Sequence, residues 1–129
     1  MWPKEEIPDE SMVFMFIHRM WVCNGEVIPG AFQDRGGGMS VDWDEHSTAE
    51  ETRQRARRPP ENGVISLGVG IIRSIQGLTV EHDPIQENTH DLQGNTIRPN
   101  RAHSEVLGEK NDERRLKLSR IYSWEIHLS

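Results

Sequence analysis

The stretch NGVISLGVGIIRSIQGLTVEHD, residues 62–83, decides the fold that the sequence predicts. It is the longest apolar run in an otherwise polar chain. Large aliphatic side chains occupy every second position of its first half, namely Ile65, Leu67, Val69 and Ile71. This two-residue period is typical of a β-strand. Gln76-Gly77 indicates a turn, and the alternation then resumes at Leu78, Val80 and His82. We therefore predict a β-hairpin at the centre of one sheet.

The composition fits one domain with a thin core and many turns. A chain of 129 residues has the usual length of a single domain. Only 34% of the residues are hydrophobic, so the four Trp, three Phe and five Met are expected to fill much of the core. The many Gly and Pro residues favour turns over long helices.

Charge and cysteine content restrict the partner and the compartment. The net charge of −6 disfavours non-specific binding of nucleic acid, which depends on neutralising phosphates. The lone Cys23 cannot form an internal disulfide, so a reducing compartment is expected. No stretch approaches the roughly 20 apolar residues of a membrane span, and the acidic N-terminus is unlike a signal peptide. We expect a cytoplasmic protein that binds another protein rather than a membrane.

The N-terminal third predicts an arm followed by strands. Residues 1–10 are expected to be extended, because Pro3 and Pro8 discourage helix. Residues 11–22 are rich in aromatic and β-branched side chains, which favour a strand. Asn24-Gly25 predicts a tight turn between residues 19–22 and 26–28.

A glycine loop and a polar helix follow. Residues 36–38 are three consecutive glycines, but the strand expected at 39–43 replaces the helix that a phosphate-binding loop requires. Ser47-Thr48-Ala49-Glu50 predicts a capping box for a helix from Thr48 to Arg57. Cations at its C-terminal end suit the helix dipole. They also form a candidate partner-binding patch together with the arm, through Trp2, Arg53, Arg57 and Arg58.

The C-terminal half predicts a long loop and a second helix. Residues 83–100 are polar and rich in turn formers, and one helical turn is expected at 100–105. Asn111 or Asp112 caps a helix that is expected to reach Ser123, before a short strand at 124–127. The sequence therefore predicts an α+β domain over residues 11–129. It has a mostly antiparallel sheet of about five strands and a C-terminal helix packed on one face.

Histidines and one arginine are the candidate catalytic residues. If the long loop folds back over the sheet, four side chains could converge, namely His18, His82, His103 and Arg114. Imidazoles can act as acid and base in phosphodiester cleavage, while an arginine stabilises the developing charge. The alternative is that each histidine is a hydrogen-bonded structural residue.

Metal and cofactor motifs are weak. The two His-Asp pairs, His82-Asp83 and His90-Asp91, offer nitrogen and oxygen ligands, but the sequence has no HExxH motif and no paired CxxC. We therefore predict neither a cofactor nor a metal ion. Glu81-His82-Asp83-Pro84, with the later Gly94-Asn95 and Asn100, resembles part of the ββα-metal hairpin of HNH nucleases. The pattern is incomplete, because the expected third histidine or asparagine is not well placed on a following helix.

Three segments resemble small bacterial proteins of uncharacterised function. They are Val80-Glu81-His82-Asp83-Pro84, Asn100-Arg101-Ala102-His103-Ser104 and Arg115-Leu116-Lys117-Leu118-Ser119. The resemblance implies no activity. Two hypotheses remain from the sequence. The first is a non-enzymatic protein-binding accessory module of a bacterial system, and the alternative is a histidine-dependent phosphodiesterase or RNase-like effector.

Overall fold

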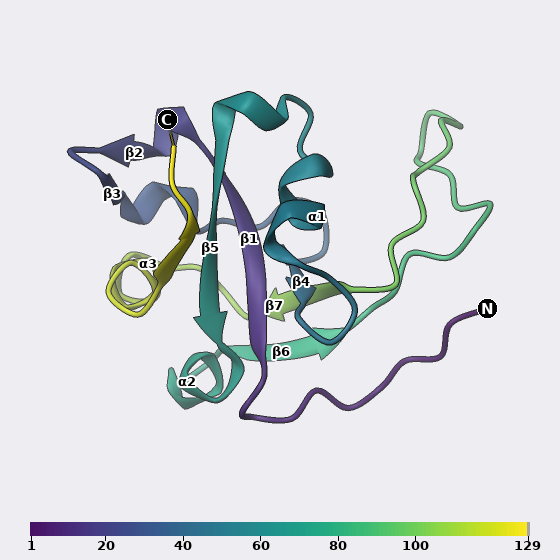
Figure 1. Ribbon diagram of the computed structural model, residues 1–129. Helices are drawn as coiled ribbons and strands as arrows, with labels where there is room; N and C mark the ends of the chain where they lie inside the picture. The colour runs from purple at the N-terminus through teal and green to yellow at the C-terminus, as the bar shows by residue number, and fades with distance from the viewer. Residues whose placement is uncertain (129) are drawn as a thin grey trace.

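A computed structural model describes residues 1–128 as an α+β fold, which confirms the predicted class (Figure 1). The elements in chain order are β1 (Met12–His18), η1 (Arg19–Trp21), β2 (Val22–Cys23), β3 (Glu26–Val27), η2 (Pro29–Ala31), β4 (Met39–Trp43), α1 (Ala49–Gln54), η3 (Pro59–Glu61), β5 (Asn62–Gly68), α2 (Val69–Ser74), β6 (Thr79–His82), β7 (His103–Leu107), α3 (Asp112–Leu118) and β8 (Ser123–Ile126). Over these residues, six strands form one antiparallel sheet in the order β6-β7-β4-β1-β5-β8.

The predicted central hairpin is wrong. β5 pairs along its whole length with β1, and the chain then turns into α2 instead of a second strand. β6 follows at the opposite end of the sheet, where it pairs with β7 (Figure 1). The alternating pattern stops at Gly68, and Val69 and Ile72 are both buried at the three-residue spacing of one helix face. A strand and a short helix thus share one continuous apolar run.

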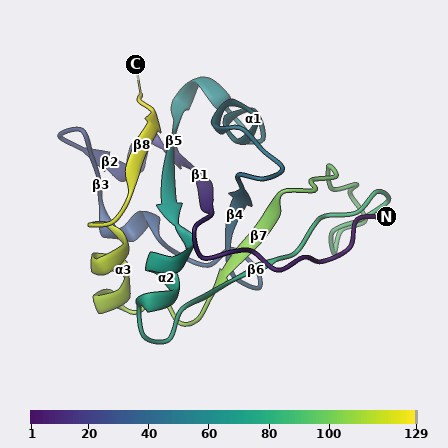
Figure 2. The same ribbon diagram turned by 60° about the horizontal axis from the view of Figure 1, so that its bottom comes forward.

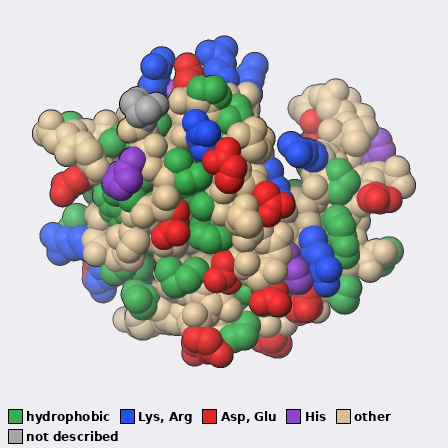
Figure 3. Space-filling model, in the orientation of Figure 1, with side chains coloured by type: hydrophobic (Ala, Val, Ile, Leu, Met, Phe, Trp, Pro, Cys, Tyr) green, Lys and Arg blue, Asp and Glu red, His purple; other side chains and the backbone are tan. Residues whose placement is uncertain are grey.

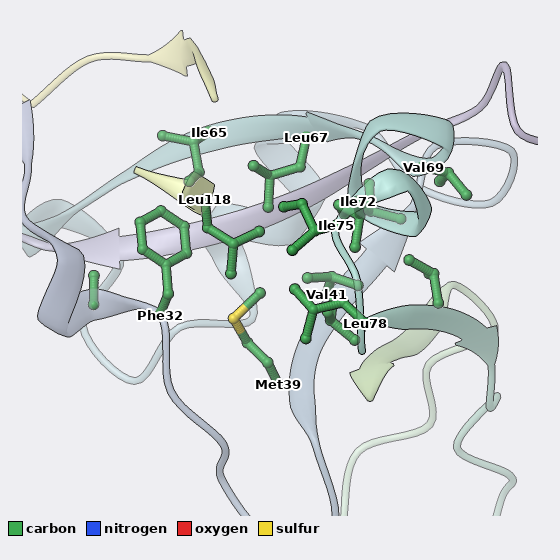
Figure 4. Packing of buried hydrophobic residues seen from close by; sticks show 14 of the residues in the cluster. Phe32, Met39, Val41, Ile65, Leu67, Val69, Ile72, Ile75, Leu78 and Leu118 are labelled. Carbon is green, nitrogen blue, oxygen red and sulfur yellow. The ribbon is translucent and has the colours of Figure 1, made fainter. Parts of the chain in front are cut away.

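The hydrophobic core lies on one face of the sheet, which we call the core face. Its strand residues include Val13, Ile17, Ile65, Leu67 and Val106, all almost fully buried. Helices α2 and α3 lie on this side (Figure 2). Figure 4 shows a side chain from α3, Leu118, reaching into the same cluster as Phe32 and Ile75. The prediction that the C-terminal helix packs on one face of the sheet is confirmed.

Local turn and cap signals are reproduced with shifts of a few residues. The Asn24-Gly25 turn joins β2 and β3, and both residues have positive φ, 53° and 79°, as a type I′ turn requires. The capping box of α1 uses Thr48 and Glu51 instead of Ser47 and Glu50. The helix is shorter than predicted, ending at Gln54.

The C-terminal half differs more from the prediction. A strand, β7, replaces the expected helical turn at 100–105, because Asn100 turns the chain and residues 103–107 pair with both β4 and β6. Helix α3 is capped by Asn111 as predicted but ends at Leu118, well before Ser123. Residues 123–126 then form β8 beside β5.

Residues 1–8 form neither helix nor strand, and this arm is fixed to the domain. Ile7 is buried in the core, and the backbone of Trp2 exchanges two hydrogen bonds with the side chain of Gln86. Figure 2 shows the arm crossing the sheet on the side of β6 and β7. Among the helices of residues 1–128, none combines the length and the apolar character that crossing a bilayer demands.

Candidate functional site

A groove runs over the second face of the sheet, opposite the core face. It consists of two adjoining pockets of about 390 and 250 Å³ that share Met15, Phe16 and Ser40. The first pocket extends over the end of β1 and the residues that follow α1. The second lies between α1 and the loop at 85–99, where Figure 3 shows the molecule hollowed. We call the combined feature the groove.

The floor of the groove is apolar and its ends carry arginines. Phe14 and Phe16 of β1 lie on the floor, and 41% of the surface of Phe16 is exposed. The arginines of the first pocket are Arg35, Arg57 and Arg58, and those of the second are Arg55 and Arg98. Figure 3 shows Lys and Arg side chains gathered at the top of the molecule, over the connection between α1 and β5. Positive charge is therefore concentrated here, although the whole chain is acidic.

A buried carboxylate organises one wall of the groove. Asp42, which is 6% exposed, accepts hydrogen bonds from Thr52 at 2.7 Å, Arg55 at 2.7 Å and Asn100 at 2.8 Å. These donors come from α1, the residue after α1, and the end of the long loop. Arg55 also donates to Ser47. Both oxygens of Asp42 are thus occupied, and the side chain joins β4 to the two segments that form the wall.

A second ionic cluster, centred on His18 and Glu61, lies in the first pocket of the groove. Nδ1 of His18 accepts from the backbone N–H of Met20, so Nε2 carries the proton and donates to Glu61 at 3.1 Å. This hydrogen bond lowers the pKa of Glu61, partial burial opposes it, and the nearby charges of Arg19 and Arg58 lower it further. Glu61 is therefore ionised, and its negative charge is balanced by the basic side chains around it.

The four predicted catalytic side chains do not meet. His18 and His103 lie on the groove face, but the strand register separates them by four residues and two strands, roughly 16 Å. His82 faces the core side, where it accepts from the N–H of Glu5 and donates to the carbonyl of Arg101. Arg114 binds the carbonyls of the turn beside α2 and of the segment before α3. These residues form no acid–base pair with one another.

The predicted partner-binding residues divide between two places. Arg57 and Arg58 line the first pocket of the groove. Arg53 instead donates to the carbonyl of Asn62 and pairs with Glu50. Trp2 lies outside the groove, at the N-terminal end of the arm beside the long loop. The arm and the arginine-rich end of α1 therefore do not form one patch.

Sequence patterns missed most of the groove. Asp42 stands between Val41 and Trp43 in a strand, where a charged residue on the face away from the core is usually solvated. Its burial depends on α1 and on the long loop folding over β4. The one sequence signal for this wall was a carboxylate between the large apolar residues Val41 and Trp43. If such a carboxylate is buried, hydrogen-bond donors from elsewhere in the chain must pack against it.

The His-Asp pairs considered as metal ligands are also separated by the fold. Both nitrogens of His82 bind backbone groups, and Asp91 caps a turn by accepting from the N–H groups of Gln93 and Asn95. Asp83 lies instead near His103 and Glu105, with one potential ligand atom of each within 4.8 Å of the others. The structure thus places a different ligand set together.

Comparisons with known proteins give no function for this chain, so any functional assignment depends on the geometry of the site. No protein-family model, curated protein or solved structure matches the chain.

Proposed function

We propose that this protein is a non-enzymatic protein-binding module whose groove receives an extended acidic peptide with apolar residues at its centre. The observation that supports this function best is the groove itself, with a partly exposed phenylalanine on its floor and arginines at both ends. The partner is another protein that carries such a segment.

The apolar floor supports peptide binding. Phe16 is 41% exposed and Met20 is 66% exposed, and both line the first pocket. Burying such side chains against apolar residues of a partner stabilises a complex by about 25 cal/mol per Å² of apolar surface. The exposed parts of Phe16 and Met20 would be removed from water when a ligand covers them.

The charges of the groove favour an acidic ligand. Within residues 1–128, Arg35, Arg57 and Arg98 make no ion pair with a carboxylate. The two acidic side chains of the groove, Asp42 and Glu61, are each bonded to basic neighbours. Acidic residues flanking an apolar anchor would therefore meet arginine at either end of the groove.

Nucleic acid fits this arrangement less well than a peptide. A nucleic-acid groove usually has cations that follow the whole phosphate backbone, with aromatic platforms between them. Here the central part of the groove is apolar, and a net charge of −6 repels a long polyanion. The separation of His18 from His103 also removes the acid–base pair that phosphodiester cleavage would use.

Fluorescence polarisation with designed peptides tests the proposal. The probe is a labelled peptide with Glu and Asp on both sides of a Leu-Phe-Leu centre, and its counterpart has Lys in place of the acids. We expect only the acidic peptide to bind. The double variant Arg57→Glu/Arg98→Glu should weaken binding about tenfold, since each reversal removes roughly 0.5–1 kcal/mol of attraction.

Matched variants separate groove binding from general charge attraction. Arg120→Glu makes the same charge change as the single groove variant Arg57→Glu, but at an exposed arginine outside the groove, and should leave affinity unchanged. Phe16→Thr, which keeps a strand-forming residue, should weaken binding at a cost in stability of only about 1 kcal/mol, because Phe16 is already 41% exposed. Equal losses for Arg120→Glu and the groove variant would contradict the proposal. So would tighter binding of single-stranded RNA than of the acidic peptide.

A further inference from the structure

We propose that Asp83, His103 and Glu105 form a binding site for a divalent transition-metal ion, with Zn²⁺ as the preferred ion. The three side chains are half-buried, and one donor atom of each lies within 4.8 Å of the others. One imidazole nitrogen and two carboxylates make up a ligand set that suits Zn²⁺ or Mn²⁺. This proposal does not depend on the peptide assigned to the groove.

The backbone brings the three residues together. His103 and Glu105 are two residues apart on β7, so both side chains lie on the face of the sheet opposite the core face. Asp83 follows β6, and its N–H donates to the carbonyl of His103 at 2.9 Å. Two ligands therefore lie on a paired strand and the third lies directly after its hydrogen-bonded neighbour, which holds a site more firmly than mobile loops do.

The ring of His103 is already oriented for a metal ion. Its Nδ1–H donates to the backbone carbonyl of Asp83 at 2.7 Å. In the neutral ring, Nε2 then keeps a lone pair, and among residues 1–128 its one hydrogen-bond partner is the exposed hydroxyl of Ser40 at 3.2 Å. In metal-ligating histidines, the ring nitrogen that does not bind the metal typically donates a hydrogen bond to a carbonyl or carboxylate. We assign Nε2 as the nitrogen ligand.

Negative charge at this place is only partly compensated by cations among residues 1–128. Glu105 lies directly opposite Glu81 in the β6–β7 register, and like charges at such positions destabilise a sheet. Within residues 1–128, neither glutamate has an ion-pair partner, while Asp83 has a loose contact with Lys4 at 3.6 Å. Lys4 is 74% exposed, so a metal ion displaces it at little cost. A bound cation would offset this repulsion.

The space around Glu105 is kept open by glycine. A Cβ on Gly38 would lie 3.2 Å from Oε2 of Glu105, closer than an ordinary contact. Ligands of a tetrahedral Zn²⁺ are about 3.4 Å apart, given metal–ligand distances of about 2.0–2.2 Å. The donor atoms therefore need to approach one another by about 1.4 Å at most, which side-chain rotation supplies.

Isothermal titration calorimetry of the full chain tests the site. The protein is stripped with EDTA, dialysed, and titrated separately with Zn²⁺, Mn²⁺ and Mg²⁺. We expect one Zn²⁺ ion per chain, tighter binding of Zn²⁺ than of Mg²⁺, and a higher melting temperature with Zn²⁺. Glu105→Gln, which keeps the shape of the side chain, should weaken Zn²⁺ binding by about tenfold or more.

Glu81→Gln is the matched control, because it removes the same charge directly opposite Glu105. It should weaken Zn²⁺ binding by no more than about threefold, through reduced electrostatic attraction. Equal losses for the two variants would overturn the proposal, since the ion would then be attracted by charge rather than coordinated. Mg²⁺ binding as tight as Zn²⁺ binding, or no heat of binding and no thermal shift with Zn²⁺, would also overturn it.

Discussion

Replacing Asp42 with alanine is the sharpest test of how the groove is held together. The side chain accepts three hydrogen bonds, from Thr52, Arg55 and Asn100, at 2.7–2.8 Å. In Asp42→Ala, these donors remain while their common acceptor is gone. Arg55 is only 21% exposed on its side chain, so its positive charge would remain largely buried without a carboxylate.

The expected loss follows from that orphaned charge. Removing one member of a buried ion pair costs about 3–5 kcal/mol. Arg55 retains the hydroxyl of Ser47 as an acceptor, and Thr52 lies 3.1 Å from the same hydroxyl, which places the estimate near the lower limit, at about 3–4 kcal/mol. For a domain of this length, such a loss lowers the melting temperature by roughly 10–15 °C.

Urea unfolding followed by tryptophan fluorescence measures the change in the free energy of unfolding. Asp44→Ala is the control, because Asp44 is exposed and has no side-chain hydrogen bond or ion pair within residues 1–128. A double-mutant cycle with Arg55→Ala should give a coupling energy of about 1–3 kcal/mol. If Asp42→Ala and Asp44→Ala cost the same, the carboxylate does not join the walls of the groove.

Other residues give tests of the surrounding framework. His82→Ala should lower the free energy of unfolding by about 3 kcal/mol. It should also speed hydrogen exchange at the backbone N–H of Glu5, which donates a hydrogen bond to His82, and unchanged exchange would argue against this tether. Lys110→Met should cost about 2–4 kcal/mol in urea unfolding, since the buried ammonium binds Asp34 and two backbone carbonyls, and an unchanged midpoint would contradict this. The basic neighbours of Glu61 lower its pKa, so the stability that this carboxylate contributes is present above its ordinary pKa. It is lost as the pH falls through the lower value of the folded state. Wild type should therefore lose more stability than Glu61→Gln as the pH falls below about 4.5, in urea unfolding measured at a series of pH values; parallel losses would count against the His18 contact.

Local sequence signals predicted those parts of the fold that depend on neighbouring residues. The Asn24-Gly25 turn requires two residues that tolerate positive φ, and these two residues do. The cap of α3 at Asn111 depends on one side chain and an amide three residues away. Such interactions are complete within a few residues of sequence, so composition and spacing reveal them.

Strand order could not be predicted in the same way. Residues 62–68 and 79–82 both alternate, and the sequence between them resembles a turn. They do not pair, because residues 69–74 between them form α2, whose Val69 and Ile72 are buried in the core. Arg73 then binds the carbonyls of Ile7 and Val80, so the arm and β6 are held beside α2. These contacts join residues distant in sequence and leave no periodic signal.

The groove follows from that strand order, and this is why its residues escaped prediction. Inserting β4 between β1 and β7 places Phe14, Asp42 and His103 in one row across the sheet. A β5–β6 hairpin would have brought His82 toward the centre and left β7 paired with β4 alone. With the observed order, His82 faces the core at the edge of the sheet while His103 faces the groove. The two histidines at either end of the long loop thereby acquire different roles: His82 is structural, and His103 is available to a ligand.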